Sequence, residues 1–151
     1  MVGMKRLAPI CALAFALDIG SPAQAQSQLL FSCGASAGHA FYLEEGFLQP
    51  GDGGWTEDGL SNGQIILLQN GETADILYRD TLGTTSVSED GGRVIPLSIS
   101  RERALLAVYY PKVVEHYLFT RNATASQVVW TQIKHDALIN KAAAFQADCE
   151  R

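Results

Sequence analysis

The sequence is poor in basic residues, cysteines and long apolar runs, and each scarcity excludes a class of protein. Lysine and arginine together number 11 against 16 acidic residues. Recognition of nucleic acid or of anionic membranes usually rests on a basic surface, so we expect neither partner. The three cysteines include no C-x-x-C pair, the spacing that tunes redox-active thiols. The longest apolar run, residues 7–17, is shorter than the roughly 20 residues needed to cross a bilayer, so we expect no membrane span.

The sequence also lacks the motifs of metal sites and of common enzymes. His39, His116 and His135 lie far apart, without the close pairs typical of zinc ligands. Residues 59–63 (GLSNG) match the G-x-S-x-G pattern of a hydrolase nucleophile, but that motif needs a strand before it and a helix after it. Here a glycine-rich stretch precedes it and a strand-like run follows, which favours a turn leading into a strand. We therefore predict no catalytic residue, no metal and no cofactor.

The first 25 residues have the pattern of a secretory signal peptide. Lys5 and Arg6 precede the apolar run, and Ala23-Gln24-Ala25 supplies the small residues of a cleavage site. We expect cleavage after Ala25 and a mature chain, residues 26–151, in the periplasm or outside the cell. Its length predicts one domain. Cleavage leaves 9 basic and 15 acidic residues, a net charge of −6.

Cys33 and Cys149 are the cysteines that remain after cleavage. Because an exported protein meets an oxidising compartment, we expect the two thiols to pair. The bridge would join the first strand to the end of the chain. Closing so long a loop stabilises the folded state by about 5 kcal/mol in the chain-entropy model, so we interpret the pair as structural.

Short apolar runs separated by turn residues predict an all-β fold. Asn70-Gly71 and Asp90-Gly91-Gly92 are typical of tight hairpin turns between successive strands. Runs spaced about 8–12 residues apart indicate a sandwich or barrel. We predict a small antiparallel barrel or sandwich of about eight strands, with its N- and C-terminal segments joined by the disulfide. The candidate strands are residues 28–33, 38–44, 64–69, 74–79, 84–89, 93–99, 103–110, 113–120, 126–134 and 142–149.

The last segment, residues 137–149, fits two structures. Asp136 is a candidate N-cap, and apolar residues follow it at helical spacing. Alternation also places Phe145, Ala147 and Cys149 on one face of a strand. We favour a strand over residues 142–149, because closing a meander would place it beside the first strand.

Residues 113–120 place an ionisable group on each face of a strand. His116 shares one face with Val114 and Leu118, and Glu115 shares the other with Tyr117. Whichever of Glu115 and His116 faces inward needs a hydrogen-bond partner or a shifted pKa. It is either a core group satisfied by a neighbouring tyrosine or arginine, or a ligand-contacting or proton-transfer group at the mouth of the fold. By the same alternation, we expect His39 to lie half-exposed at the start of its strand.

Residues 49–63 are predicted to form the longest loop and the main binding surface. They combine Trp55 with Asp52, Glu57 and Asp58. Long loops on a rigid scaffold carry binding more often than other segments. An exposed tryptophan beside carboxylates stacks on a sugar ring or receives a cation. The alternative is that Trp55 folds back over one end of the core.

These features together predict an exported, non-catalytic module that binds a protein or small ligand of unknown identity. The candidate binding residues are Trp55, Asp52, Glu57, Asp58 and His116. In export, size and terminal cysteine pair, the chain resembles in outline small periplasmic inhibitors of cell-wall hydrolases. No motif of those inhibitors is present, so the resemblance implies no inhibitory residue. The alternatives are a structural protein of the cell envelope and a small hydrolase that uses His116 with a carboxylate.

Overall fold

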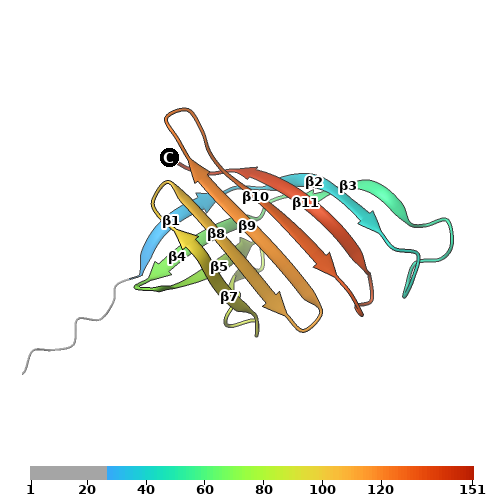
Figure 1. Ribbon diagram of the computed structural model, residues 1–151. Coiled ribbons are helices and arrows are strands. Elements are labelled where there is room, and N and C mark those ends of the chain that lie inside the picture. The colour runs from blue at the N-terminus through green and yellow to red at the C-terminus, as the bar shows by residue number, and fades with distance from the viewer. Residues whose placement is uncertain (1–26) are drawn as a thin grey trace, which may run out of the picture.

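The computed structural model describes residues 27–151, so the expected signal peptide and its cleavage site lie outside the described residues. The described chain is all-β, and its 11 strands form two antiparallel sheets (Figure 1). This confirms the all-β prediction with more strands than the eight expected. The strands are β1 (Gln28–Cys33), β2 (Ser36–Tyr42), β3 (Gly54–Leu60), β4 (Gln64–Asn70), β5 (Thr73–Asp80), β6 (Gly83–Ser86), β7 (Arg93–Ile99), β8 (Arg103–Tyr110), β9 (Val113–Arg121), β10 (Ser126–Lys134) and β11 (Lys141–Asp148).

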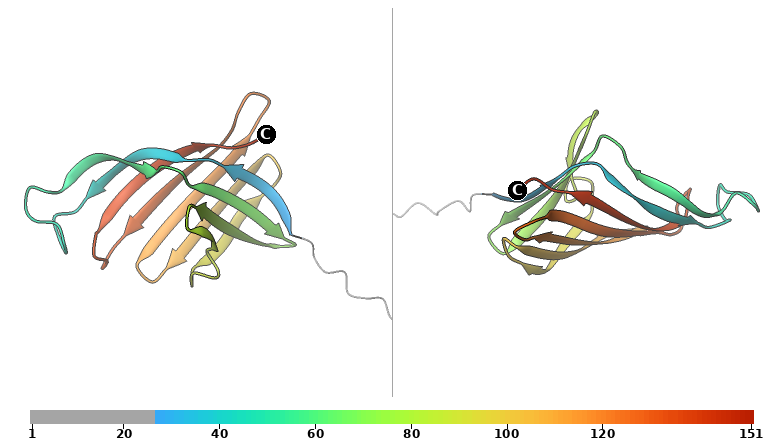
Figure 2. Two further views of the ribbon diagram at one scale, coloured as in Figure 1. Left: turned by 180° about the vertical axis from the view of Figure 1, so that it is seen from behind. Right: turned by 90° about the horizontal axis from the view of Figure 1, so that it is seen from above.

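One long ribbon connects the two sheets. The larger sheet has the order β3-β2-β11-β10-β9-β8-β7, and the smaller has the order β1-β4-β5-β6. β1 pairs with β4 in the smaller sheet, whereas their continuations β2 and β3 pair with each other in the larger one. The ribbon therefore passes from one sheet to the other, as Figure 2 shows from two sides. The remaining strands of the larger sheet, β7 to β11, form a meander of consecutive hairpins.

The disulfide lies where this ribbon changes sheets. Cys33 ends β1, Cys149 directly follows β11, and the two are bonded across 116 residues of chain. Backbone bonds flank the bridge, from Gly34 N–H to the Asp148 carbonyl (2.9 Å) and from Glu150 N–H to the Ser32 carbonyl (2.7 Å). The predicted pairing of the two ends of the domain is confirmed, and β11 is the favoured strand rather than a helix.

Two predictions of local structure are wrong. Residues 49–63 are not one loop, because β3 forms within them and pairs along its whole length with β2. Asp90-Gly91-Gly92 does not close a hairpin, because β6 pairs with β5 while β7 pairs with β8 in the other sheet. That turn instead carries the chain between sheets. The other two turns are confirmed: Gly71, with φ of 61°, reverses the chain between β4 and β5, and residues 61–63 lead into β4.

The core lies between the inner faces of the two sheets. Phe31 of β1 packs on Phe119 of β9 with ring centroids 5.2 Å apart, and both are almost fully buried. Tyr117, Trp130 and Phe145 form a stacked aromatic row on the larger sheet, with centroids 5.5 Å and 4.3 Å apart. Aromatic stacking of this kind adds about 0.5–1.5 kcal/mol per pair beyond burial of area. Among residues 27–151, no helix has the length and apolar character to span a membrane.

Candidate functional site

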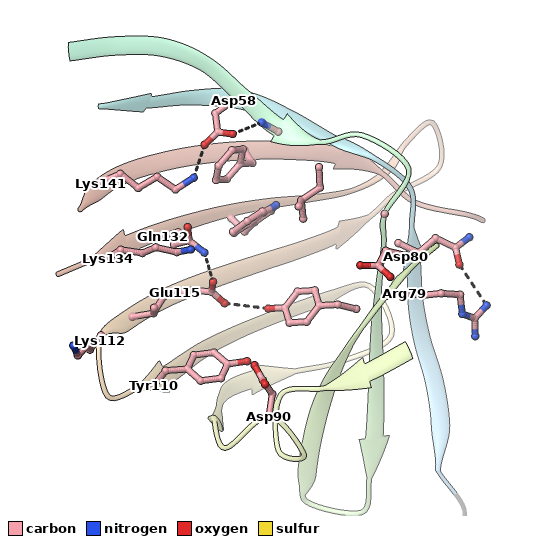
Figure 3. Close-up of a pocket in the computed structure, with 18 of the residues that line it drawn as sticks. Asp58, Arg79, Asp80, Asp90, Tyr110, Lys112, Glu115, Gln132, Lys134 and Lys141 are labelled. Atoms are coloured by element: carbon pink, nitrogen blue, oxygen red, sulfur yellow. Dashed lines mark hydrogen bonds and ion pairs between the residues drawn. The ribbon is translucent and has the colours of Figure 1, made fainter. Parts of the chain in front are cut away.

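A cleft of about 640 Å³ lies between the two sheets (Figure 3). Its floor and one wall come from the larger sheet, and the facing wall comes from β4 and β5 of the smaller one. The end of β3 and the turn that holds Asp90 complete its rim. A volume of this size falls within the range of about 300–1,000 Å³ that small-molecule sites occupy.

Three cross-strand rows of side chains build the floor, because β9, β10 and β11 pair in register and alternate residues face inward. The deepest row is the aromatic one, in which Trp130 lies opposite both Tyr117 and Phe145. The next row is polar and pairs Gln132 with Glu115. The cleft therefore changes from aromatic to polar between its deepest row and the next.

The outermost row is basic. Lys134 lies directly opposite Lys141 on β11, and opposite Val113 on β9. Lys112 precedes Val113 in the chain and also lines the cleft. Figure 3 shows the three lysines at the strand ends of the larger sheet. All the lysines of the described chain thus lie at one cleft.

Glu115 is the centre of a buried hydrogen-bond network, although it is a carboxylate. It is 5% exposed and accepts bonds from Tyr117 Oη (2.8 Å), Tyr78 Oη (3.0 Å) and Gln132 Nε2 (2.6 Å). The hydroxyl oxygens of Tyr78 and Tyr117 also lie 2.5 Å apart, so two hydroxyl protons are shared among three close oxygens. Burial, followed by the neighbouring negative charge of Glu115, raises the pKa of Tyr78. Burial also raises the pKa of Tyr117, with contributions from Tyr78 and Glu115, so both hydroxyls remain protonated donors at neutral pH.

Asp58 and Lys141 form an ion pair at the edge of the cleft. Asp58 also accepts a bond from Tyr42 Oη at 3.0 Å and one from its neighbour, Gly59 N–H, at 2.8 Å. Burial alone would raise the pKa of Asp58, but the bonds from Lys141, Tyr42 and Gly59 outweigh it and lower the pKa. The pair ties the edge strand β3 to β11 across β2. Lys141 is therefore neutralised in place, whereas Lys112 and Lys134 have no carboxylate within ion-pair distance among residues 27–151.

The predicted binding residues do not gather at one place. Asp58 lines the cleft. Trp55 and Glu57 are exposed on the outer face of β3, and Asp52 is exposed in the turn that precedes it. His116 is exposed on the outer face of β9, so the sheet separates it from the cleft and from Glu115. The ionisable side chain that faces inward on β9 is Glu115. Its hydrogen bonds to tyrosines agree with the first of the two sequence interpretations, a core group satisfied by its neighbours.

Trp55 does not fold back over the core. Its side chain is 73% exposed and meets Phe41 edge-on, with ring centroids 5.5 Å apart. His39, on the same outer face, is exposed in the middle of β2 rather than half-exposed at its start. It lies between Ala144 of β11 and Glu57 of β3.

The outer face of the larger sheet carries a second feature, an apolar row that crosses six strands. Each member lies opposite the next in the strand register, from β8 to β3, and the row extends for about 24 Å at ordinary strand spacing. Ile133 at its centre is 54% exposed. We call this the outer row; its members are Tyr109, Val114, Ile133, Ala142, Phe41 and Trp55.

Sequence reasoning missed most of the cleft. Tyr78 and Gln132 come from different sheets, and no local pattern shows that their side chains meet Glu115. One signal was present: residues 27–151 have lysine only at positions 112, 134 and 141, each beside or within a predicted strand end. No group of three histidine, cysteine, aspartate or glutamate side chains within residues 27–151 is placed to hold a metal ion.

Comparison with known proteins returns nothing similar. No family model, no curated protein and no solved structure matches the chain. Inference about function therefore rests on the cleft and on the outer row.

Proposed function

We propose that the protein is an exported, non-catalytic binding module that takes a small, partly apolar ligand into the cleft between its sheets. The observation that carries the proposal is the composition of the cleft. The surface of the cleft is mainly apolar, with aromatic side chains at its floor and polar and charged side chains held at fixed positions above them. Ligand sites are typically apolar cavities with a small number of oriented polar groups.

The state of Glu115 supports binding rather than catalysis. A general acid or base must exchange a proton with the substrate, and a candidate needs a free or replaceable position for it. Glu115 instead accepts three hydrogen bonds from protein donors, which fix its orientation. His116, the partner that the hydrolase alternative requires, lies on the opposite face of the sheet.

A thermal-shift screen of the disulfide-bonded protein against partly apolar small molecules tests the proposal. A ligand at 100 times its dissociation constant adds about 2.7 kcal/mol, enough to raise the melting temperature by several degrees. Val113→Trp places a large ring at the mouth of the cleft and should abolish the shift. Val129→Trp makes the same change on the outer face of β10 and should leave it intact. Equal shifts in both variants would refute binding in the cleft.

The outer row favours a second candidate function, self-association of a structural protein. Contiguous apolar surface on the outside of a protein usually marks an interaction site. The row ends at Trp55 on one side and is continued on the other by Arg93, which lies opposite Tyr109. Two copies stacked face to face with their rows reversed would bring Arg93 of each copy to Trp55 and Glu57 of the other. A cation–π contact and an ion pair would then form at both ends, so the charges favour a second copy as the occupant.

Sedimentation equilibrium tests this second candidate. The wild-type protein should form dimers, and Ile133→Glu, at the centre of the outer row, should convert them to monomers. Gln127→Glu adds the same charge to the same face of β10, about 20 Å away, and should leave the dimer intact. A wild-type protein that is monomeric at high concentration would refute self-association.

A further inference from the structure

We propose that the ligand of the cleft is an amphiphile, with an anionic head group that contacts Lys112 and Lys134 and an apolar body that lies over the aromatic floor. This inference rests on the function proposed above, since it names the ligand class for the same cleft. It combines two observations: where the lysines of the chain lie, and which of them have partners.

The lysines make one cleft locally basic, although the protein as a whole is acidic. Cleavage at the predicted site leaves 15 acidic residues against 9 basic ones, yet the lysines of residues 27–151 all line one cleft. They come from the turn before β9, the end of β10 and the start of β11. The cleft as a whole is lined by four basic and four acidic side chains, but the lysines stand together along one rim, and like charges grouped in this way attract ligands of the opposite sign to that rim.

The pairing of these lysines leaves two of them available. Lys141 is held by Asp58. Lys134 faces Lys141 directly across the strand pair, and like charges in that position destabilise a sheet. Among residues 27–151, no carboxylate pairs with Lys134 or with Lys112. Asp58 already balances the charge of Lys141, and an anionic head group would supply the partner that Lys134 and Lys112 lack.

Three of the four acidic side chains of the cleft have partners of their own, Asp58 through its ion pair with Lys141. Glu115, one row below the lysines, accepts hydrogen bonds from Tyr78, Tyr117 and Gln132. Asp80 accepts the backbone N–H groups of Leu82 (2.7 Å) and Gly83 (3.2 Å) in the turn between β5 and β6. Figure 3 shows Asp80 and Asp90 on other walls of the cleft, away from the strand ends that carry the lysines. The lysines therefore form a basic rim at the strand ends of the larger sheet, while Arg79 lines the facing wall, where its guanidinium donates to Thr84 Oγ1 and Gln64 Oε1.

Apolar side chains lie beside the basic rim and provide a place for the body of the ligand. Val113 adjoins Lys112, and Tyr110 lies opposite Val113 on β8. Leu60 lines the same cleft from β3, and Trp130 and Phe145, whose rings are stacked on each other, line it at greater depth. A head group at the lysines places an attached chain or ring against these surfaces, where burial of apolar area favours binding.

A set of ligands that share one chain and differ in the head group tests the inference by isothermal titration calorimetry on the disulfide-bonded protein, below micelle-forming concentrations. Decanoate and decyl phosphate should bind, 1-decanol should bind at least tenfold more weakly, and decyltrimethylammonium more weakly still. The order of decanoate and decyl phosphate distinguishes a carboxylate from a phosphate head. Because the lysines lie at the rim, the preference for the anions should decrease with added salt.

Two pairs of substitutions locate the head group. Lys112→Gln with Lys134→Gln should weaken decanoate binding by about 25-fold, about fivefold per exposed ion pair, and leave the affinity for 1-decanol unchanged. Arg101→Gln with Arg103→Gln removes the same charge near the start of β8, outside the cleft, and should change neither ligand.

The possible failures separate this inference from the proposed function. Equal affinity of the wild-type protein for decanoate and 1-decanol would refute the anionic head group while leaving ligand binding in the cleft intact. An equal loss of decanoate affinity in the double lysine variant and in the double arginine variant would also refute the anionic head group at Lys112 and Lys134. Binding of inorganic phosphate as tight as that of decyl phosphate would refute the apolar body. A protein that binds none of the decyl compounds and shows no hit in the thermal-shift screen would refute both proposals.

Discussion

Replacing Glu115 with leucine should destabilise the fold by about 2–4 kcal/mol, although it removes a charge from a buried site. The carboxylate accepts bonds from two tyrosine hydroxyls and from Gln132. In the variant, Tyr78 and Tyr117 still bond to each other, so one hydroxyl proton is stranded, at about 1–3 kcal/mol. The lost charge-assisted bonds add to this, and relief of the carboxylate's desolvation offsets part of it. Gln132 is half-buried and turns toward water.

Two further variants separate the network from the shape of the side chain. Glu115→Gln keeps an acceptor oxygen toward both tyrosines, and Gln132 can rotate its amide so that its oxygen accepts from the new NH₂ group. The loss in the free energy of unfolding should therefore stay below about 1 kcal/mol. Adding Tyr78→Phe and Tyr117→Phe to Glu115→Leu removes every stranded hydroxyl. Replacing all members of a buried polar group by apolar ones is often nearly neutral, so this triple variant should recover much of the lost stability.

Urea denaturation of the disulfide-bonded proteins, followed by circular dichroism, measures these differences. From most to least stable, the expected order is wild type, Glu115→Gln and Glu115→Leu, and the triple variant should be more stable than Glu115→Leu. If Glu115→Leu is as stable as the wild type, desolvation of the carboxylate cancels its hydrogen bonds, and the network does not stabilise the fold.

Three other predictions concern stability. Cys33→Ser with Cys149→Ser should lower the free energy of unfolding by about 5 kcal/mol, because the bridge spans 116 residues, and an unchanged urea midpoint would contradict this. The pKa values of Tyr78 and Tyr117 are raised in the folded protein, so their contribution to the free energy of unfolding should be fully present below pH 10. Above pH 10 the free energy of unfolding should fall by about 1.4 kcal/mol for each tyrosine and each pH unit. If tyrosinate absorbance shows that Tyr78 and Tyr117 ionise with ordinary pKa values in the folded protein, this prediction is refuted. Because the pKa of Asp58 is lowered, its contribution is present above about pH 4 and lost as the pH falls, so Asp58→Asn should flatten the acid side of the stability profile.

Local sequence patterns predicted those parts of the fold that depend on one strand at a time. In β9, alternation assigned Glu115 and His116 to opposite faces, and the structure keeps them there. In β11, alternation competed with helical spacing. The strand wins because pairing with both β10 and β2 satisfies its backbone on two sides.

The sequence did not predict the parts that depend on pairing. β3 (GWTEDGL) has the composition of a loop, and it becomes a strand because β2 offers a full set of backbone partners. As an edge strand it has one neighbour, and the inward-facing Asp58 is a charge that discourages further pairing at that edge. The residues Asp90-Gly91-Gly92 likewise predict a turn after β6, but they do not indicate which sheet the next strand joins.

The two candidate functions use opposite faces of the same strands, and this makes them separable. In β10, Ile133 is the centre of the outer row and the adjacent Lys134 belongs to the basic rim of the cleft. Successive residues of a strand point to opposite sides of the sheet, so a substitution at one position leaves the other surface unchanged. Ile133→Glu should therefore abolish self-association without altering decanoate affinity, and Lys134→Gln should weaken decanoate binding about fivefold without altering self-association. If each substitution impairs both properties, the two faces are coupled, and the larger sheet works as one surface rather than two.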